Sequence, residues 1–266
     1  MRSIWNGALS FGLVHIPVRL FSATEDRDVH FRQLHRADHT PIQYRRHCPA
    51  CGQDVGPEDI VRGYEYLPGQ FVVLEDEDLE QLPLPTQKTM EILDFVRVEE
   101  VDPIYFERSY FIAPAEGGAR PFALLRAAME RTGRAGLCRV ALRAKERLGL
   151  VRLYQGRALV LETLHYPDEI RQPEGLEELE RLPAPSEREL VIAEQLVQSL
   201  AVPFQPERYR DRYREALQEL IERKVAGQEL VAPARAEETV PMDLLAALEE
   251  SVRRVEAQRA LAGRTG

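Results

Sequence analysis

Three consecutive segments in the middle of the chain constrain its fold more than any other feature. Apolar and polar residues alternate in "LCRVALR" (137–143), "LGLVRLYQ" (148–155) and "RALVLETL" (157–164). Alternation with a period of two is typical of a β-strand that buries one face. Short, closely spaced strands with glycine inside them are typical of a closed barrel rather than a doubly wound sheet. The sequence therefore predicts a β-barrel.

The first residues of the chain, "RSIWNGALSFGLVHIPVRLF" (2–21), are apolar on both faces. Gly7, Gly12 and Pro17 disfavour a helix here, because glycine and proline both weaken helices. We expect one strand that is buried on both sides and bends twice, with the glycines at barrel corners. Two further strand-like runs are "TMEILDFVRV" and "PIYFERSYFIA", and Pro68-Gly69 suits a turn between two more strands.

Helical patterns are confined to one segment of the barrel region and to the C-terminal third. Pro121 and Gly133 suit the beginning and the end of a helix over 121–132. From residue 166 the chain is rich in proline and acids, as expected of a linker. Ser186 with Glu189 predicts a capping box and a helix after it. Further helices are expected over about 206–226 and 242–261. The predicted fold class is α+β, mainly β.

The charge of the chain is unevenly distributed. The formal net charge is −9, but residues 120–157 contain ten Lys and Arg and only two Asp and Glu. Arg139 and Arg143 should lie on one face of a strand, about 13 Å apart, and Arg152 and Arg157 would extend the row. Concentrated basic residues are expected of a surface that faces phosphates. The alternative is a solvated face whose arginines pair with the acidic segment 67–115.

The candidate DNA-contacting residues are all basic and come from the predicted strip and from the segment before it. They are Arg32, Arg36, Arg45, Arg46, Arg62, Arg126, Arg134, Arg139, Arg143, Lys145, Arg147, Arg152 and Arg157.

Four residues have the character of zinc ligands. His35 and His39 precede Cys48 and Cys51, and Cys-Pro-x-Cys-Gly is a frequent form of zinc knuckle. The spacing of the cysteines is diagnostic, whereas that of the histidines is not. The ligands would come from one chain or be shared across a subunit contact. The alternative is a reduced cysteine pair in a turn beside surface histidines.

The sequence lacks the common catalytic motifs. It contains no G-x-x-x-x-G-K-[ST], no G-x-S-x-G and no H-E-x-x-H, which favours a binding protein over an enzyme. Tyr64, Tyr66 and Phe71 have the character of base-stacking residues, but core aromatics on a hairpin are the favoured interpretation. No long apolar run and no leader pattern is found, so the expected location is the cytoplasm.

Several motifs together resemble the bacterial Ku family. They are "RSIWNGALSFGLVHIPVRLFSA", "RGYEY…GQFVVL", "VDPIYFERSYFIAP", "ALLRAAM", "LVLETLHYPDEIR" and "PERYRDRYREALQELIERKVAG", in order from Arg2 to about Gly227. The resemblance implies a Ku-type β-barrel core with an extended arm over residues 1–185. It also implies a helical C-terminal arm and partner-binding region over residues 186–266.

The resemblance also implies a function. Members of the family bind ends of double-stranded DNA as ring-shaped homodimers in non-homologous end joining, without catalysis, near the nucleoid. They recruit the ATP-dependent DNA ligase of the pathway and require no cofactor, so a structural zinc would be an addition. Many carry a lysine-rich tail, but residues 228–266 contain no lysine, so strict dependence on DNA ends is expected.

Two alternatives from other functional classes remain open at this stage. The first is a zinc-dependent nuclease or regulator that uses His35, His39, Cys48 and Cys51. The second is an interaction scaffold whose C-terminal helices bind a partner while the barrel is structural.

Overall fold

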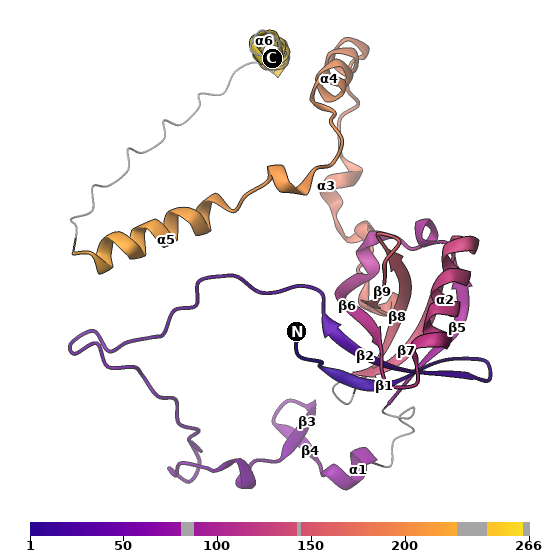
Figure 1. Cartoon of the computed structure of the whole chain (residues 1–266). Helices are drawn as coiled ribbons and strands as arrows, with labels where there is room; N and C mark the ends of the chain where they lie inside the picture. Colours follow the sequence, from indigo (N-terminus) through magenta and orange to yellow (C-terminus); the bar gives the residue numbers. More distant parts are fainter. Residues whose placement is uncertain (81–87, 143–144, 228–243, 263–266) are drawn as a thin grey trace. The chain divides into compact units, whose positions relative to one another are not determined.

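Seven strands from the N-terminal part of the chain form a closed β-barrel (Figure 1). A computed structural model gives the structure of residues 1–80, 88–142, 145–227 and 244–262. The strands follow one another around the barrel in the order β1-β2-β6-β9-β8-β7-β5. They are β1 (Trp5–Phe11), β2 (Val14–Ser22), β5 (Thr89–Val96), β6 (Phe106–Pro114), β7 (Ala135–Leu142), β8 (Lys145–Tyr154) and β9 (Ala158–Leu164). The predicted barrel and the α+β class are confirmed.

The opening segment is a hairpin and not the single bent strand expected from the sequence. β1 and β2 pair in antiparallel fashion, with Trp5 opposite Leu20 and Phe11 opposite Val14. Gly12 has a φ of +57° at the turn between them, a conformation that glycine adopts at little cost. The reversal explains the pattern, because each strand of the hairpin contributes its own apolar face to the barrel.

The barrel is closed by its one parallel pair within the described residues, which joins β1 to β5. The backbone of β1 approaches β5 closely at Gly7. A Cβ atom on Gly7 would lie 2.2 Å from the carbonyl oxygen of Lys88 and 2.4 Å from the ring of Trp5. Glycine is therefore required there by the close approach of two backbones, which agrees with a role in closing the sheet.

The barrel encloses the main core, and a second, smaller core covers part of its outer surface. In β7, alternate residues such as Cys138 and Val140 face the main core. Leu150 and Leu164 belong to the second core, which the segment 96–106 helps to cover. This two-sided packing explains why the alternation in β7 to β9 is incomplete, with apolar residues also on the outer face of the strands.

A helix between β6 and β7 packs against the barrel. The helix α2 (Ala119–Thr132) buries Phe122, Leu125 and Met129 in the main core and ends at Gly133, which has a φ of +63°. The helix expected over 121–132 is confirmed. Its apolar residues recur at helical spacing, and the left-handed glycine provides the C-terminal stop.

The chain between β2 and β5 forms an arm, here defined as residues 23–75. It contains the hairpin of β3 (Arg62–Leu67) and β4 (Gln70–Leu74), with Gly69 at the expected turn. No residue of the arm is buried. The short helix α1 (Asp76–Glu80) follows it. The arm is therefore ordered by local hydrogen bonds rather than by a core of its own.

The chain divides into two compact units, residues 1–172 and residues 173–266. The domain boundary predicted at residue 185 lies within the second unit. The helices of this unit are α3 (Glu177–Glu180), α4 (Glu187–Leu200), α5 (Arg212–Val225) and α6 (Leu244–Ala262). Helices α4 and α6 contact each other. None of the helices in the described residues is long and apolar enough to cross a membrane.

Two predictions for this unit have different outcomes. The capping box is confirmed, because Ser186 Oγ accepts from the backbone N–H of Glu189 and the backbone N–H of Ser186 donates to Glu189. The helix expected from about residue 206 is partly wrong. Residues 206–208 form a 3-10 turn, and α5 begins at Arg212 after an N-cap at Asp211.

Candidate nucleic-acid interface

The predicted basic residues fall into two groups. Arg126, Arg134, Arg139, Lys145, Arg147, Arg152 and Arg157 belong to α2, β7, β8 and the adjoining turns, whereas Arg32, Arg36, Arg45, Arg46 and Arg62 belong to the arm. Arg143 lies outside the described residues. The two groups differ in how many of their side chains already have a carboxylate partner.

Strand register separates the basic residues of the barrel onto two faces. Arg139 lies opposite Leu148, and Val140 lies opposite Arg147. Directly opposed residues of antiparallel strands share a face, and alternate residues of one strand do too. Arg139 and Arg152 therefore share the outer face, whereas Lys145 and Arg147 project from the face of the buried Val140. The basic strip is not one continuous row.

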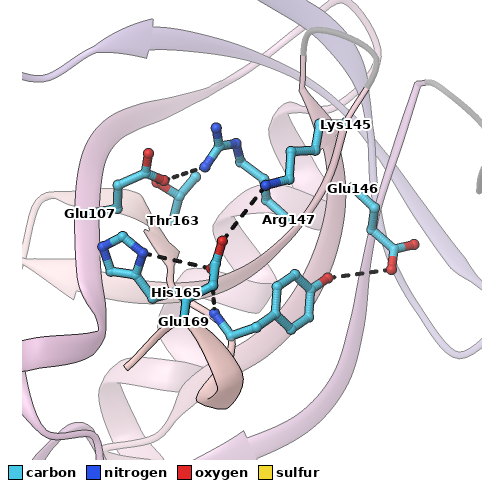
Figure 2. A network of polar contacts seen from close by, with 8 residues as sticks. Glu107, Lys145, Glu146, Arg147, Thr163, His165 and Glu169 are labelled. Carbon is cyan, nitrogen blue, oxygen red and sulfur yellow. Dashed lines mark hydrogen bonds and ion pairs between the residues drawn. The ribbon is translucent and has the colours of Figure 1, made fainter. Parts of the chain in front are cut away.

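The side chains of Lys145 and Arg147 belong to a network that we call the paired cluster (Figure 2). Its members are Glu107, Lys145, Glu146, Arg147, Thr163, His165, Tyr166 and Glu169. Arg147 forms an ion pair with Glu107, and Thr163 Oγ1 donates to the same carboxylate at 3.1 Å. Lys145 Nζ lies 3.7 Å from Glu169 Oε1. Each predicted basic residue of the cluster therefore has an acidic partner.

Two members of the paired cluster have shifted pKa values. The backbone N–H of Tyr166 is the main cause of a lowered pKa of Glu169, and Lys145 and His165 lower it further. Burial raises the pKa of Tyr166, and the nearby Glu146 carboxylate, to which its hydroxyl donates, adds to the effect. Both shifts favour the ionised glutamate and the neutral phenol that hold the cluster together.

The outer face contains a second arginine that is fully engaged. Arg152 Nε donates to Glu162 Oε1 at 2.9 Å, and Ser109 Oγ donates to the other oxygen of that carboxylate. The side chain of Glu162 is only 5% exposed. Arg139 is more loosely paired, 3.7 Å from Glu91. The alternative anticipated from the sequence, in which arginines pair with the acidic segment 67–115, thus applies to Arg139 and to Arg147.

The remaining predicted residues have different surroundings. Arg126 donates to the carbonyl oxygen of Gly156 at 3.0 Å and so links α2 to the turn between β8 and β9. Arg45 lies 3.3 Å from Asp54, and Arg134 lies close enough to Glu100 to lower its pKa, after the larger effect of Arg97.

Other arginines are available for an external anion. Within the described parts of the chain, no side-chain hydrogen bond or ion pair is found for Arg32, Arg36, Arg46 or Arg157. All of them are exposed. They are the predicted residues that need no rearrangement before meeting a phosphate.

Sequence reasoning missed one basic residue near the paired cluster. Arg108 lines a cavity of about 130 Å³ together with Trp5 and Arg147. The indole Nε1 of Trp5 is buried and has no hydrogen-bond partner within the described residues. The alternation in "YFERSYFIA" could have placed Arg108 on one face of a strand. The register between β6 and β9, which fixes its position in the barrel, cannot be predicted from that pattern.

The four predicted metal ligands do not converge within one chain. No three His, Cys, Asp or Glu side chains of the described residues are grouped as a metal site. The His35 ring is 3.0 Å from Asp38, and His39, which follows the turn at residues 36–38, has a φ of +57°. Of the four, Cys48 and Cys51 are close in space, and Cys51 lowers the pKa of Cys48.

The backbone N–H groups of Cys51 and then Ala50 are the main cause of a lowered pKa of Cys48. Cys138 is different, because burial in the barrel raises its pKa to about 12.

The interpretation of the hairpin aromatics as core residues is wrong for the single chain, because Tyr64, Tyr66 and Phe71 are all more than half exposed.

Comparison with known proteins identifies relatives over nearly the whole chain. The family model described as Ku70/Ku80 beta-barrel domain matches residues 10–192. A protein of Symbiobacterium thermophilum is 48% identical over 98% of this chain and 65% of its own length. A protein of Frankia casuarinae is 48% identical over 97% and 65%. One of Heliobacterium modesticaldum is 43% identical over 97% and 94%.

All three relatives carry the name Non-homologous end joining protein Ku. This chain spans 65% of the length of the first two, so those proteins contain further sequence that it does not match.

Proposed function

Because the chain belongs to the Ku family, we propose that it binds ends of double-stranded DNA in non-homologous end joining. The observation that carries the proposal is the match of the Ku barrel model to residues 10–192, which includes every strand of the closed barrel except the first residues of β1. The names of relatives that align with nearly the whole chain support the pathway.

The mechanism that we propose is mechanical. Two copies form a ring that encloses the duplex, and arginine side chains contact phosphates on both strands. Arg32, Arg36, Arg46 and Arg157 are the first candidates for these contacts, because they have no carboxylate partner to displace in the described residues. Contacts with phosphates release counterions and carry no sequence information. Affinity should therefore fall steeply with salt and be insensitive to sequence.

The paired arginines have a different role in this proposal. Arg147 and Arg152 fix the strands from which the binding surface is built, because each holds a carboxylate that is mostly buried. A phosphate would have to compete with that carboxylate for the guanidinium group. The acidic partners also limit the positive potential of the barrel surface, so binding depends on enclosure of the duplex rather than on adhesion to one face.

The remaining parts of the proposal concern partners and location. The protein would act without catalysis and recruit the ATP-dependent DNA ligase of the pathway through its second unit. Helices α4 and α5 expose apolar residues, among them Val197 and Tyr213, to which a partner protein can bind. The expected location is the cytoplasm, close to the nucleoid.

The experiment compares linear and covalently closed DNA of the same sequence. We expect the protein to bind linear DNA, to be retained on it when both ends are then blocked by bulky groups, and to bind the closed circle poorly. The three DNAs should be compared at several salt concentrations, since non-specific binding decreases with salt. Equal affinity for linear and circular DNA at moderate salt would contradict enclosure.

A further inference from the structure

The cavity beside Trp5 lies at one mouth of the barrel. Trp5, Glu107, Arg108 and Arg147 stand near the beginnings of β1, β6 and β8, and Leu142 ends β7. Strands β1, β6 and β8 run in the same direction, because one antiparallel strand separates each from the next. Strand β7 runs against β8. The beginnings of the three strands and the end of β7 therefore meet at the same end of the barrel.

A β-bulge in β6 directs two neighbouring charged residues to this cavity. Phe106 lies opposite Leu164 and Arg108 lies opposite Thr163, so Glu107 is an extra residue without a partner in β9. Successive residues of a regular strand point to opposite faces, whereas a bulge re-aims side chains locally. Glu107 and Arg108 both line the cavity. The bulge therefore explains how two adjacent residues reach one site.

The charges around the cavity leave one arginine uncompensated. Arg147 and Thr163 both donate to the same oxygen of the Glu107 carboxylate (Figure 2). The side chain of Arg108 is exposed and has no hydrogen bond or ion pair within the described residues. Two arginines and one glutamate among the described lining residues give a formal charge of +1. The cavity therefore favours an anion over a cation.

The inner wall of the cavity contributes a buried hydrogen-bond donor. Trp5 packs against the main core, and its indole Nε1 is buried without a partner in the described residues. Buried N–H groups of folded proteins usually have an acceptor. Gly7 leaves room for the indole, since a Cβ atom on it would lie 2.4 Å from the ring. The N–H is thus a fixed donor that an acceptor in the cavity can use.

The size of the cavity and the origin of its donors suit a phosphate group. Its volume of about 130 Å³ is roughly ten times the space that one water needs. The donors come from three strands: the indole N–H of β1, the guanidinium of Arg108 in β6, and the N–H groups of Arg147 in β8 that Glu107 does not use. A phosphate group presents three acceptor oxygens in different directions, whereas a carboxylate presents two in one plane.

We propose that this mouth of the barrel binds a phosphate group that carries no more than one substituent. The exposed Arg108 contacts the anion at the opening, and the buried indole N–H of Trp5 donates to its innermost oxygen. A phosphate inside a nucleic-acid chain is excluded, because chain continues from two of its oxygens. The phosphate comes either from a free compound, such as inorganic phosphate or a nucleotide, or from the 5′-phosphate that ends a DNA strand. Only the second source rests on the proposed function.

The first measurement uses the indole itself. Trp5 is the single tryptophan of the sequence, so its indole N–H gives one resonance that reports on this site. In ¹H–¹⁵N spectra of the full chain, sodium phosphate should move that resonance, and sodium chloride of equal ionic strength should not. Arg108→Ala should raise the dissociation constant for phosphate about 10-fold or more, because a charge-assisted hydrogen bond is lost.

Arg120→Ala is the matched control. Arg120 is also exposed, has no side-chain partner within the described residues, and lies in α2, which follows the other end of β6. This variant should bind phosphate as the unaltered chain does. A second measurement, the broadening of the ³¹P signal of phosphate by the protein, should weaken in Trp5→Phe and in Arg108→Ala but not in the control. Because Arg108 is exposed, its variant tests the proposal even where Trp5→Phe disturbs the barrel.

Two outcomes would overturn the inference: an indole resonance that phosphate leaves in place, as expected if the cavity holds only water, or equal phosphate affinity in Arg108→Ala and the unaltered chain. Short duplexes with 5′-phosphate or 5′-hydroxyl ends then distinguish the sources. A larger shift with the 5′-phosphate assigns the site to DNA ends, and equal shifts assign it to free phosphate compounds. The phosphate titration contains no DNA, so its failure and a failure to bind DNA ends are separate results.

Discussion

Arg152 and Glu162 form an ion pair across the neighbouring strands β8 and β9, with Nε 2.9 Å from Oε1. The glutamate side chain is 5% exposed and the arginine side chain 28% exposed. Ser109 of β6 donates to the second carboxylate oxygen, so side chains from three adjacent strands interact at the Glu162 carboxylate. This basic residue therefore acts as part of the barrel structure.

Removal of the arginine should destabilise the barrel. In Arg152→Ala, Glu162 would be left buried and without its cation, and such losses cost about 3–5 kcal/mol. Urea unfolding followed by fluorescence would measure the free energy of unfolding. The control is Arg139→Ala, whose partner Glu91 is more than half exposed and whose loss should cost about 0–1 kcal/mol. Equal losses in the two variants would contradict this assignment.

The unpaired arginines should determine the salt dependence of DNA binding. Arg32→Ala with Arg157→Ala should lower the slope of log K against log salt by about 0.9 for each phosphate that is no longer neutralised. All DNA sequences should be affected alike, because phosphates carry no sequence information. Arg139→Ala, which removes a paired side chain, should change the slope less. Fluorescence anisotropy with linear duplexes over a salt series provides the data, and a larger effect of the Arg139 variant would refute the assignment.

The cysteines should differ in reactivity. Cys138 has its pKa raised to about 12 by burial, so at neutral pH it is a neutral thiol that reagents cannot reach. Cys48 has a lowered pKa and belongs to the arm. In metal-free protein, iodoacetamide at pH 7 should label Cys48 within minutes and Cys138 only after unfolding in urea. Mass spectrometry of peptides would distinguish them, and labelling of native Cys138 would show that the barrel opens.

Closure of the barrel should depend on Gly7. In Gly7→Ala the new Cβ would collide with the carbonyl oxygen of Lys88, so β1 must move away from β5. Overpacking of this kind costs about 1–3 kcal/mol. Gly175→Ala is a suitable control because no heavy atom lies within 4 Å of its added Cβ. Denaturant midpoints would show the difference, and an unaltered midpoint in Gly7→Ala would mean that the strands have room to separate.

The capping box of α4 makes a prediction about pH. The hydroxyl and backbone N–H of Ser186 lower the pKa of Glu189 below its ordinary value of 4.5. Since the folded pKa is lowered, the contribution of the ionised glutamate is present above pH 4.5 and is lost as pH falls through the lowered pKa. NMR titration should give a midpoint below 4.5 that rises towards 4.5 in Ser186→Ala. An unchanged midpoint would exclude the Ser186 hydroxyl as a cause.

The sequence predicts the elements better than the contacts between them. The alternation in β7 to β9, the Pro121 and Gly133 limits of α2 and the Ser186 cap are local signals, and each marks an element that is present. The turn at Gly12 is hidden because a hairpin and a bent strand with apolar faces have the same composition. The pairing of Arg147 with Glu107 depends on residues 40 positions apart, and only the strand order of the barrel brings them together.

The candidate binding residues show the same division. Their basic character and their concentration along the chain are visible in the sequence, but the partner of each side chain is not. Cross-strand register decides that Arg152 is engaged by a buried carboxylate while Arg157, in the next turn, has no such partner among the described residues. The exposure of Tyr64 and Phe71 is hidden too, because an aromatic run looks alike whether its own chain or another molecule covers it.

The parallel pairing of β1 with β5 makes the arm an insertion with two anchors instead of a free tail. During synthesis, β1 cannot pair with β5 until the ribosome has made the whole arm. The length and the surface residues of the arm can therefore change in evolution while the register of the strands on either side stays the same. A pull on the arm, in turn, would be transmitted directly to the seam where the barrel is closed.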